Sequence, residues 1–141
     1  MKLDLSSLRK AIDSLERTLR VAEDKSLAAE LDDDVTDAIR AGVIQNFEFA
    51  YELCWKFMRR WLKENAQAEE TEHPRTRKEV FRLAARYGLV RDPLSWFAHS
   101  DARNLTSHTY DEATAESVYR SALDFLEDAK YLLVKLQEHN E

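Results

Sequence analysis

The residues Val43–Leu62 read VIQNFEFAYELCWKFMRRWL, and their apolar pattern decides the fold. Spacings of three and four place the apolar side chains in two adjacent seams of one helix. The first seam comprises Val43, Phe47, Ala50, Cys54, Phe57 and Trp61, and the second comprises Ile44, Tyr51, Trp55, Met58 and Leu62. A helix that is apolar over so wide an arc needs neighbours on two sides. We therefore predict a helix from Val35 to about Lys63 within a bundle, with its second, aromatic seam buried against another copy of the chain.

The segments on both sides of this helix also have helical periodicity. One seam runs from Leu5 to Ala22, and another runs from Ala115 to Leu136. Asp33 or Asp34 is the expected N-cap of the long helix, because a carboxylate suits the positive end of a helix. The sequence thus predicts an all-α fold, an up-and-down antiparallel four-helix bundle with an additional short helix, dimeric.

Capping signals mark the shorter helices. Thr76 and Glu79 have the spacing of a capping box, which opens a short helix that Gly88 closes. Asp92 followed by Pro93 starts a further helix, on which Trp96, His99 and Arg103 share a face. Between the long and the short helix, residues 65–75 (NAQAEETEHPR) have no apolar period, and we expect a mobile, solvent-facing connection.

Composition bounds the class of protein. The 141 residues suit one domain, 1–141, and the two Gly and two Pro are too few for a turn-rich β-sandwich. A net charge of −6 argues against nucleic-acid binding over a broad basic surface, so any contact with RNA or nucleotide must be local. No window approaches the ~18 uninterrupted apolar residues of a membrane helix. Cys54 is the only cysteine and is expected to be a buried, inert thiol, which suits a cytoplasmic protein.

The stretch Arg103–Tyr110, RNLTSHTY, gathers an arginine, a histidine and a tyrosine among small hydrogen-bonding side chains. Thr109 and Glu112 have the spacing of a second capping box, so we predict Thr109 as the N-cap of a last helix that begins at Tyr110. Free backbone N–H groups and the positive end of that helix would make an anion site beside His108.

On an uninterrupted helix Arg103 and His108 would diverge, because residues five apart are rotated by about 140°. A bend held by local hydrogen bonds from Asn104, Thr106 and Ser107 would let them converge on one phosphate. We expect the phosphate-binding side chains there to be Asn104, Ser107 and Thr109.

Such a group of residues could cleave RNA by transesterification. His108 would remove the proton of the 2′-hydroxyl, and Arg103 would stabilise the charge that grows on the phosphoryl oxygens, with no metal required. One histidine in each chain's motif leaves the acid for the leaving group unassigned, and a dimer that apposes two motifs would supply a second. Spacing alone also allows a purely structural role for both residues at a helix junction.

The pattern Arg103-x4-His108-x-Tyr110 resembles the R-x4-H-x-Y motif of HEPN-domain toxins from HEPN–MNT toxin–antitoxin pairs. The run VIQNFEFAYELCWKFMRRWL, a later Trp-containing helix and ARNLTSHTYDE are similar to the bacterial nucleotidyltransferase substrate-binding proteins. The two family names cover overlapping proteins, and the similarity spans nearly the whole chain.

The resemblance implies a homodimeric bundle partnered with a minimal nucleotidyltransferase (MNT-type) antitoxin, with no cofactor. It implies that Arg103 and His108 carry a metal-independent RNase activity. Tyr110 matches the tyrosine to which the partner transfers AMP in some pairs. The alternative for Tyr110 is a first-turn tyrosine that packs on the neighbouring helix.

Other candidate residues have ordinary explanations. Glu48 and Glu52 lie one turn apart, but Lys56 follows Glu52 at i+4 and predicts a surface ion pair. His99 could extend the phosphate face, although we expect it to be structural. Glu70 and His73 have the Glu-x-x-His form of di-iron bundles, but the form occurs once, so we expect no metal site.

The aspartates of residues 31–37, LDDDVTD, could suggest a nucleotidyltransferase. Such an enzyme also needs a Gly-containing strand–turn to hold triphosphate, and the first Gly of this chain is Gly42, which comes after the aspartates. Nucleotidyl transfer is therefore assigned to another polypeptide. Three hypotheses remain: an RNase toxin, a non-catalytic substrate- or nucleotide-binding subunit of a two-component nucleotidyltransferase, and a helical interaction module.

Overall fold

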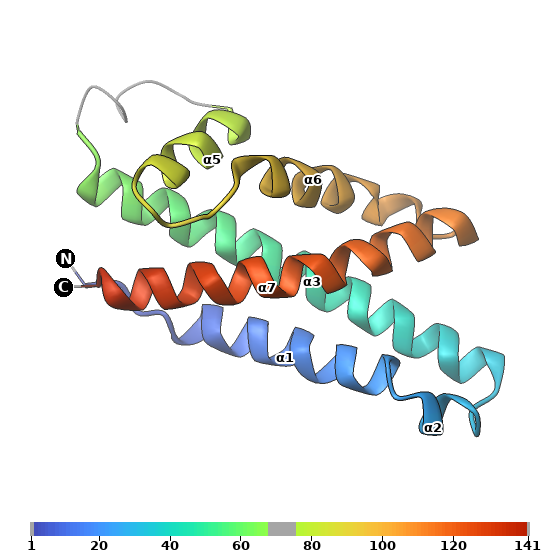
Figure 1. The fold of residues 1–141 in the computed structure, drawn as a ribbon. Coiled ribbons are helices and arrows are strands. Elements are labelled where there is room, and N and C mark those ends of the chain that lie inside the picture. The colour runs from blue at the N-terminus through green and yellow to red at the C-terminus, as the bar shows by residue number, and fades with distance from the viewer. Residues whose placement is uncertain (1, 68–75, 141) are drawn as a thin grey trace.

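The computed structural model describes residues 2–67 and 76–140, and within these ranges every regular element is a helix. The elements are α1 (Ser6–Ala22), α2 (Lys25–Ala28), α3 (Asp33–Asn65), α5 (Arg77–Arg86), α6 (Pro93–Asn104), the 3-10 helix η1 (Leu105–His108) and α7 (Glu112–Glu138). The predicted all-α bundle is confirmed. Figure 1 shows α1, α3 and α7 running along one another, with α6 beside α3 and α7 and the short α5 beyond it. The one-turn helix α2 was not predicted.

The long helix α3 spans the whole bundle. With 33 residues and a rise of about 1.5 Å per residue, it is roughly 50 Å long. Its N-cap is Asp32, whose Oδ1 accepts a hydrogen bond of 2.9 Å from the backbone N–H of Val35. The prediction of Asp33 or Asp34 as the cap was therefore wrong, because both residues already lie in the first helical turn, where their charge favours the helix dipole.

Both apolar seams of α3 are buried by the chain itself. In the second seam Ile44, Tyr51, Met58 and Leu62 are buried, and Trp55 packs edge-on against Phe81 of α5 at 5.7 Å between ring centroids. The prediction that another subunit buries this seam was wrong, because α5 and α6 cover it. The homodimer itself stays a prediction.

An aromatic cluster at the centre of the core joins α3, α6 and α7. Phe125 of α7 makes edge contacts with Phe47 at 5.1 Å and with Trp96 at 5.7 Å. Burying each phenylalanine contributes roughly 1.5–3 kcal/mol. Cys54 is fully buried as predicted, and burial raises the pKa of its thiol, which therefore stays protonated.

The predicted caps of the shorter helices are confirmed. Thr76 Oγ1 accepts from the N–H of Glu79, and Asp92 Oδ1 accepts from the N–H of Leu94, with Pro93 in the first turn. Gly88 has φ +80°, a backbone conformation that L side chains rarely adopt, and it ends α5. The connection at 68–75 lies outside the described residues.

The two ends of the described chain meet. Asn140 donates from Nδ2 to the carbonyl of Leu3 at 2.9 Å, and its Oδ1 accepts from the N–H of Leu3 at 2.8 Å. In Figure 1 both ends lie at the opposite end of the bundle from the α6–α7 junction. None of the helices in the described ranges combines the length and the apolar character needed to cross a membrane.

Candidate functional site

The junction of α6 and α7 contains all the residues predicted for the site. Helix α6 ends at Asn104, η1 covers Leu105–His108, and α7 begins at Glu112. Its N-cap is Asp111, whose Oδ2 accepts from the N–H of Thr114 at 3.0 Å. The predicted cap at Thr109 was therefore wrong. The turn after η1 places the carboxylate of Asp111, rather than the hydroxyl of Thr109, at the free N–H groups of the helix.

Thr106 holds the bend. Its buried hydroxyl donates to the carbonyl of Arg103 at 2.8 Å and accepts from Nη1 of Arg103 at 3.4 Å. The hydroxyl of Thr109 donates to the carbonyl of Thr106 at 3.3 Å. The side chains of Asn104 and Ser107 are exposed at the surface of the junction. The predicted bend is thus present, but of the three residues expected to hold it only Thr106 does so, since Asn104 and Ser107 make no side-chain hydrogen bond within the described residues.

Arg103 lies in the last turn of α6 and points back to α3. Its Nε is 3.2 Å from Oε1 of Glu52, and the two side chains are 32% and 40% exposed. The Nε atom is fully buried but makes no hydrogen bond of good geometry. The contact is therefore an ion pair that holds the guanidinium in place but leaves its Nε–H without a hydrogen-bond acceptor.

Glu52 is shared between two arginines. Nη1 of Arg77, at the start of α5, lies 3.4 Å from the same Oε1 and donates to the hydroxyl of Tyr51 at 3.2 Å. Burial opposes the charge of Arg77, but Tyr51 and Glu52 outweigh it and raise the pKa of the guanidinium. The predicted ion pair of Glu52 with Lys56 was wrong, because contacts between helices replace it. Two guanidinium groups around one carboxylate leave net positive charge at this place.

His108 and Tyr110 lie on the outside of the junction. Both side chains are exposed, Tyr110 to 87%, and their ring centroids are 6.2 Å apart with the planes at 68°. The expectation that Tyr110 opens α7 or packs on a neighbouring helix was wrong, since it lies in the turn before Asp111. In the free chain Arg103 contacts Thr106 and Glu52, whereas His108 contacts Tyr110, so their convergence on one phosphate stays a prediction.

His99 has a structural role. It is buried, packs edge-on against Trp96 and Phe125, and its Nε2 lies 2.7 Å from Oδ2 of Asp128. Burial alone would raise the pKa of Asp128, but hydrogen bonds from His99 and Arg91 outweigh it and lower that pKa. His99 therefore fastens α6 to α7 and does not extend a phosphate face.

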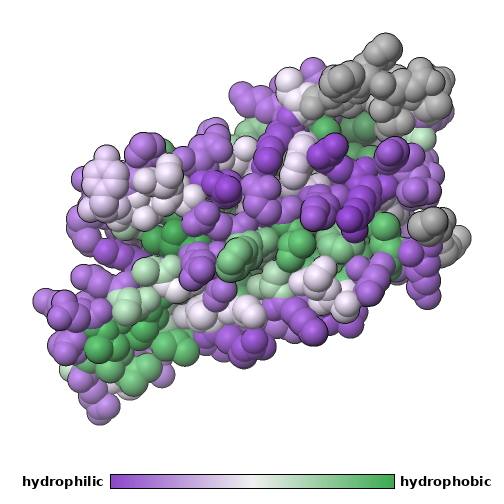
Figure 2. All heavy atoms as spheres, turned by 180° about the vertical axis from the view of Figure 1, so that it is seen from behind, coloured by the Kyte–Doolittle hydropathy of each residue, from purple (hydrophilic) through white to green (hydrophobic). Residues whose placement is uncertain are grey.

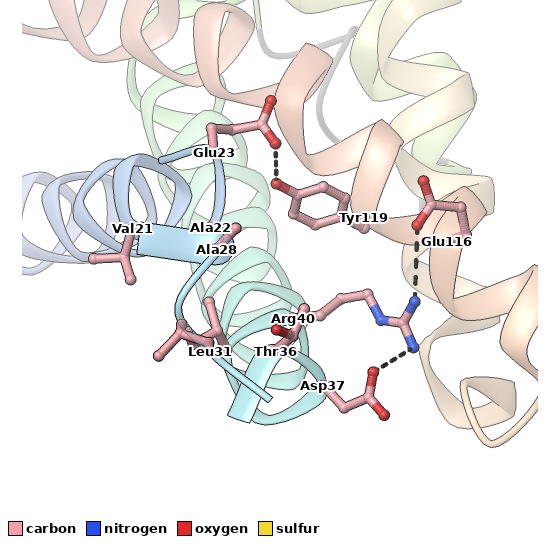
Figure 3. Close-up of a pocket in the computed structure, with 11 residues that line it drawn as sticks. Val21, Ala22, Glu23, Ala28, Leu31, Thr36, Asp37, Arg40, Glu116 and Tyr119 are labelled. Carbon is pink, nitrogen blue, oxygen red and sulfur yellow. Dashed lines mark hydrogen bonds and ion pairs between the residues drawn. The ribbon is translucent and has the colours of Figure 1, made fainter. Parts of the chain in front are cut away.

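A separate hollow of about 170 Å³ lies where the loop between α1 and α3 meets α7 (Figure 3). Figure 2 shows a hydrophobic patch over this end of the bundle, at lower left. Val21, which lines the hollow, is 43% exposed. The apolar part of the lining is Val21, Ala22, Ala28, Leu31 and Ile39. No sequence signal predicted it.

Arg40 is the cation of this hollow, but acidic groups already neutralise it. Its two terminal nitrogens bind both carboxylate oxygens of Glu112 at 2.6 and 2.8 Å. Asp37 and Glu116 lie 3.6 and 3.7 Å away, and Tyr119 donates to Glu23 at 2.5 Å. Excess negative charge disfavours a phosphate there, so the hollow is not a second anion site. The clamp of Arg40 on Glu112 instead fixes the first turn of α7 against α3.

Across residues 2–67 and 76–140, no group of three or more His, Cys, Asp or Glu side chains is placed to hold a metal ion. Glu70 and His73 lie outside the described residues. The structure therefore offers the junction, with its arginine, histidine and tyrosine, as the candidate site.

The fold is an all-helical bundle, and comparison with known proteins assigns its family. Residues 3–138 match the family model described as nucleotidyltransferase substrate binding protein like, and the chain belongs to that family. It is 39% identical, over 99% of its own length and 96% of the relative's, to a protein of Haemophilus influenzae called probable ribonuclease HepT.

Two solved structures share the fold. HI0074 from Haemophilus influenzae, described as having the fold of a substrate binding domain of a nucleotidyltransferase, is 39% identical with a TM-score of 0.90, over 95% of this chain and 99% of that one. The protein ttk003001694 from Thermus thermophilus is 28% identical with a TM-score of 0.71, over 92% of this chain and 98% of that one.

Proposed function

We propose that this protein is the HEPN-type toxin of a toxin–antitoxin pair, a metal-independent endoribonuclease that uses Arg103 and His108. The observation that carries the proposal is the junction itself. It presents an exposed His108 beside an exposed Tyr110, with Arg103, in the last turn of α6, held by Thr106 and Glu52. The 39% identity to a probable ribonuclease supports the same interpretation.

The chemistry follows from the two side chains. His108 takes the proton of a ribose 2′-hydroxyl, whose oxygen attacks the adjacent phosphorus as the bond from phosphorus to the 5′-oxygen breaks. The products are a 2′,3′-cyclic phosphate and a 5′-hydroxyl, and the leaving oxygen must receive a proton. In a homodimer the second subunit's histidine would donate it. Arg103 exchanges Glu52 for the phosphate and stabilises its growing charge, while Arg77 remains with Glu52.

The partner in this proposal is a minimal nucleotidyltransferase of the MNT type. Tyr110 is 87% exposed, so an enzyme could reach its hydroxyl and transfer AMP to it. The added phosphate would stand beside His108 and repel the RNA backbone, which neutralises the toxin. We place the pair in the cytoplasm, with residues 1–141 acting as one domain, and Asn104, Ser107 and Thr109 contacting the phosphate.

One observation favours a second function. HI0074 is described as a substrate binding domain of a nucleotidyltransferase, so this chain could be a non-catalytic subunit that binds substrate or nucleotide for such an enzyme. Both functions would use Arg103 and His108 against phosphate, but only the first cleaves RNA.

The deciding experiment incubates the purified chain, free of any partner, with single-stranded RNA in the presence of EDTA from pH 6 to 8. We expect cleavage by the wild type and a loss of about 10²–10⁴-fold in the His108→Ala variant. Because His108 is exposed, this substitution should leave the folded state intact. RNA that stays whole with the wild type would contradict the ribonuclease and favour the binding subunit.

A further inference from the structure

Charge is strongly segregated along the chain. Residues 55–63, near the end of α3, carry four Lys or Arg and no acid, and α5 carries four with only Glu79 as an acid. Residues 23–37, at the other end of the bundle, carry seven acids and one lysine. A chain with a net charge of −6 thus presents a concentrated basic surface over α5 and the adjoining end of α3.

The cations of α5 form a stripe. Lys78, Arg82 and Arg86 follow one another at spacings of four, so they lie on one side of the helix, and all three are exposed. Like charges at i and i+4 destabilise a helix by a few tenths of a kcal/mol per pair. Lys78 and Arg82 form no ion pair with any residue in the described ranges. Helix stability therefore does not explain the stripe.

Aromatic rings support these cations. Nζ of Lys78 and Cζ of Arg82 lie 5.4 and 5.2 Å from the ring centroid of Phe97 on α6. On α3, Trp55 lies under Arg77 at 4.6 Å and under Arg59 at 5.4 Å. Phe97 and Trp55 are both half-buried, so part of each ring faces solvent. Surfaces that combine cations with accessible aromatic rings are typical of single-stranded nucleic-acid binding.

The basic surface is connected to the candidate site. Arg77 stacks on Trp55 and shares the carboxylate of Glu52 with Arg103. A strand whose phosphates follow α5 would therefore reach Arg103 across Arg77 without crossing the acidic end of the bundle. Phosphates and bases together match a surface of cations beside solvent-facing rings, which favours RNA as the occupant.

We propose that the surface formed by Arg59, Arg77, Lys78, Arg82, Trp55 and Phe97 binds the sugar–phosphate backbone and bases of single-stranded RNA and leads it to Arg103. This inference rests on the proposed ribonuclease function, whose substrate path it specifies. Lys78 and Arg82 bind phosphates distant from the cleaved bond, while the solvent-facing parts of Trp55 and Phe97 contact bases.

The test uses RNA that cannot be cleaved. A fluorescein-labelled oligonucleotide of about 15 nucleotides, 2′-O-methylated throughout, is titrated with the full chain, and anisotropy is followed from about 50 to 200 mM NaCl. We expect Lys78→Ala/Arg82→Ala to weaken binding about tenfold at the lowest salt. The slope of log K against log salt should fall by about 1.4, since each phosphate contact with a single strand contributes about 0.7.

The matched control is Arg9→Ala/Lys10→Ala, which removes the same charge from exposed positions of α1. We expect its affinity and salt slope to equal those of the wild type. The inference would be overturned if both double variants lost affinity equally or if neither lost any. It would also be overturned if labelled polyglutamate bound as tightly as the RNA. A wild type that binds the probe through this surface but cleaves no RNA would refute the ribonuclease alone.

Discussion

The guanidinium of Arg103, in the last turn of α6, forms an ion pair with Glu52 in the middle of α3, with 3.2 Å between Nε and Oε1. The candidate catalytic arginine is therefore occupied by a carboxylate when no substrate is bound. A phosphate must compete with Glu52, although Arg77 can retain that carboxylate when Arg103 leaves it.

Replacing Glu52 with glutamine should strengthen RNA binding. The amide keeps the shape of the side chain but removes the charge that competes with phosphate, so affinity for a 2′-O-methylated strand should rise several-fold. Because both partners are partly exposed, the loss of stability should not exceed about 1 kcal/mol. Anisotropy and urea unfolding check the two effects. Unchanged or weaker binding would show that Glu52 does not compete for Arg103.

Tyr110 should be the single site of AMP addition. Co-expression with a nucleotidyltransferase encoded beside this chain, followed by intact-mass measurement, should reveal an AMP adduct on the wild type and none on Tyr110→Phe. Tyr51 and Tyr119 are internal comparisons, since Tyr51 is fully buried and Tyr119 donates to Glu23. Modification of Tyr110→Phe to the same extent would contradict the assignment.

The cap of α7 can be tested by two alanine substitutions. Asp111→Ala should lower the midpoint of thermal unfolding, because the N–H of Thr114 then loses its acceptor. Thr109→Ala removes a single hydroxyl bond to the carbonyl of Thr106 and should lower it less. A larger fall in the unfolding midpoint for Thr109→Ala than for Asp111→Ala would show that Thr109 is the cap.

Asp128 should make stability fall in acid. Its pKa is lowered in the folded chain because His99 and Arg91 outweigh the effect of burial. The stabilisation is therefore complete above the pKa of the unfolded chain, about 4, and is lost as the pH falls through the lower, folded value. Urea unfolding between pH 7 and 3 should show this fall in the free energy of unfolding. The Asp128→Asn variant should be less stable than the wild type at pH 7, and its free energy of unfolding should fall less towards pH 3. Parallel curves for the two proteins would contradict the coupling.

Much of the architecture could be predicted because helices leave local traces in sequence. The seams of α1, α3 and α7, the capping box at Thr76 and the pair Asp92–Pro93 depend on residues within one or two turns of each other. The cap of α7 was misplaced because Thr109 and Asp111 both suit an N-cap, and the path of the turn selects between them.

Contacts between distant segments could not be predicted. Nothing local in the sequence links Glu52 to Arg77 and Arg103, and the i+4 rule favoured Lys56 instead. The burial of the second α3 seam depends on where α5 packs, which the apolar pattern of α3 does not specify. The hollow beside Arg40 is likewise lined by residues of α1, α2, α3 and α7, which are distant in sequence, and the four residues of α2 are too few for a periodic signal.

The reciprocal amide bonds between Leu3 and Asn140 have a practical consequence. A fluorescent or affinity fusion at either terminus would extend from the end of the bundle that lies opposite the α6–α7 junction. The neighbouring termini also make the chain suitable for circular permutation. A short linker could join them, and new ends could be opened in the turn between α2 and α3 without cutting any long helix.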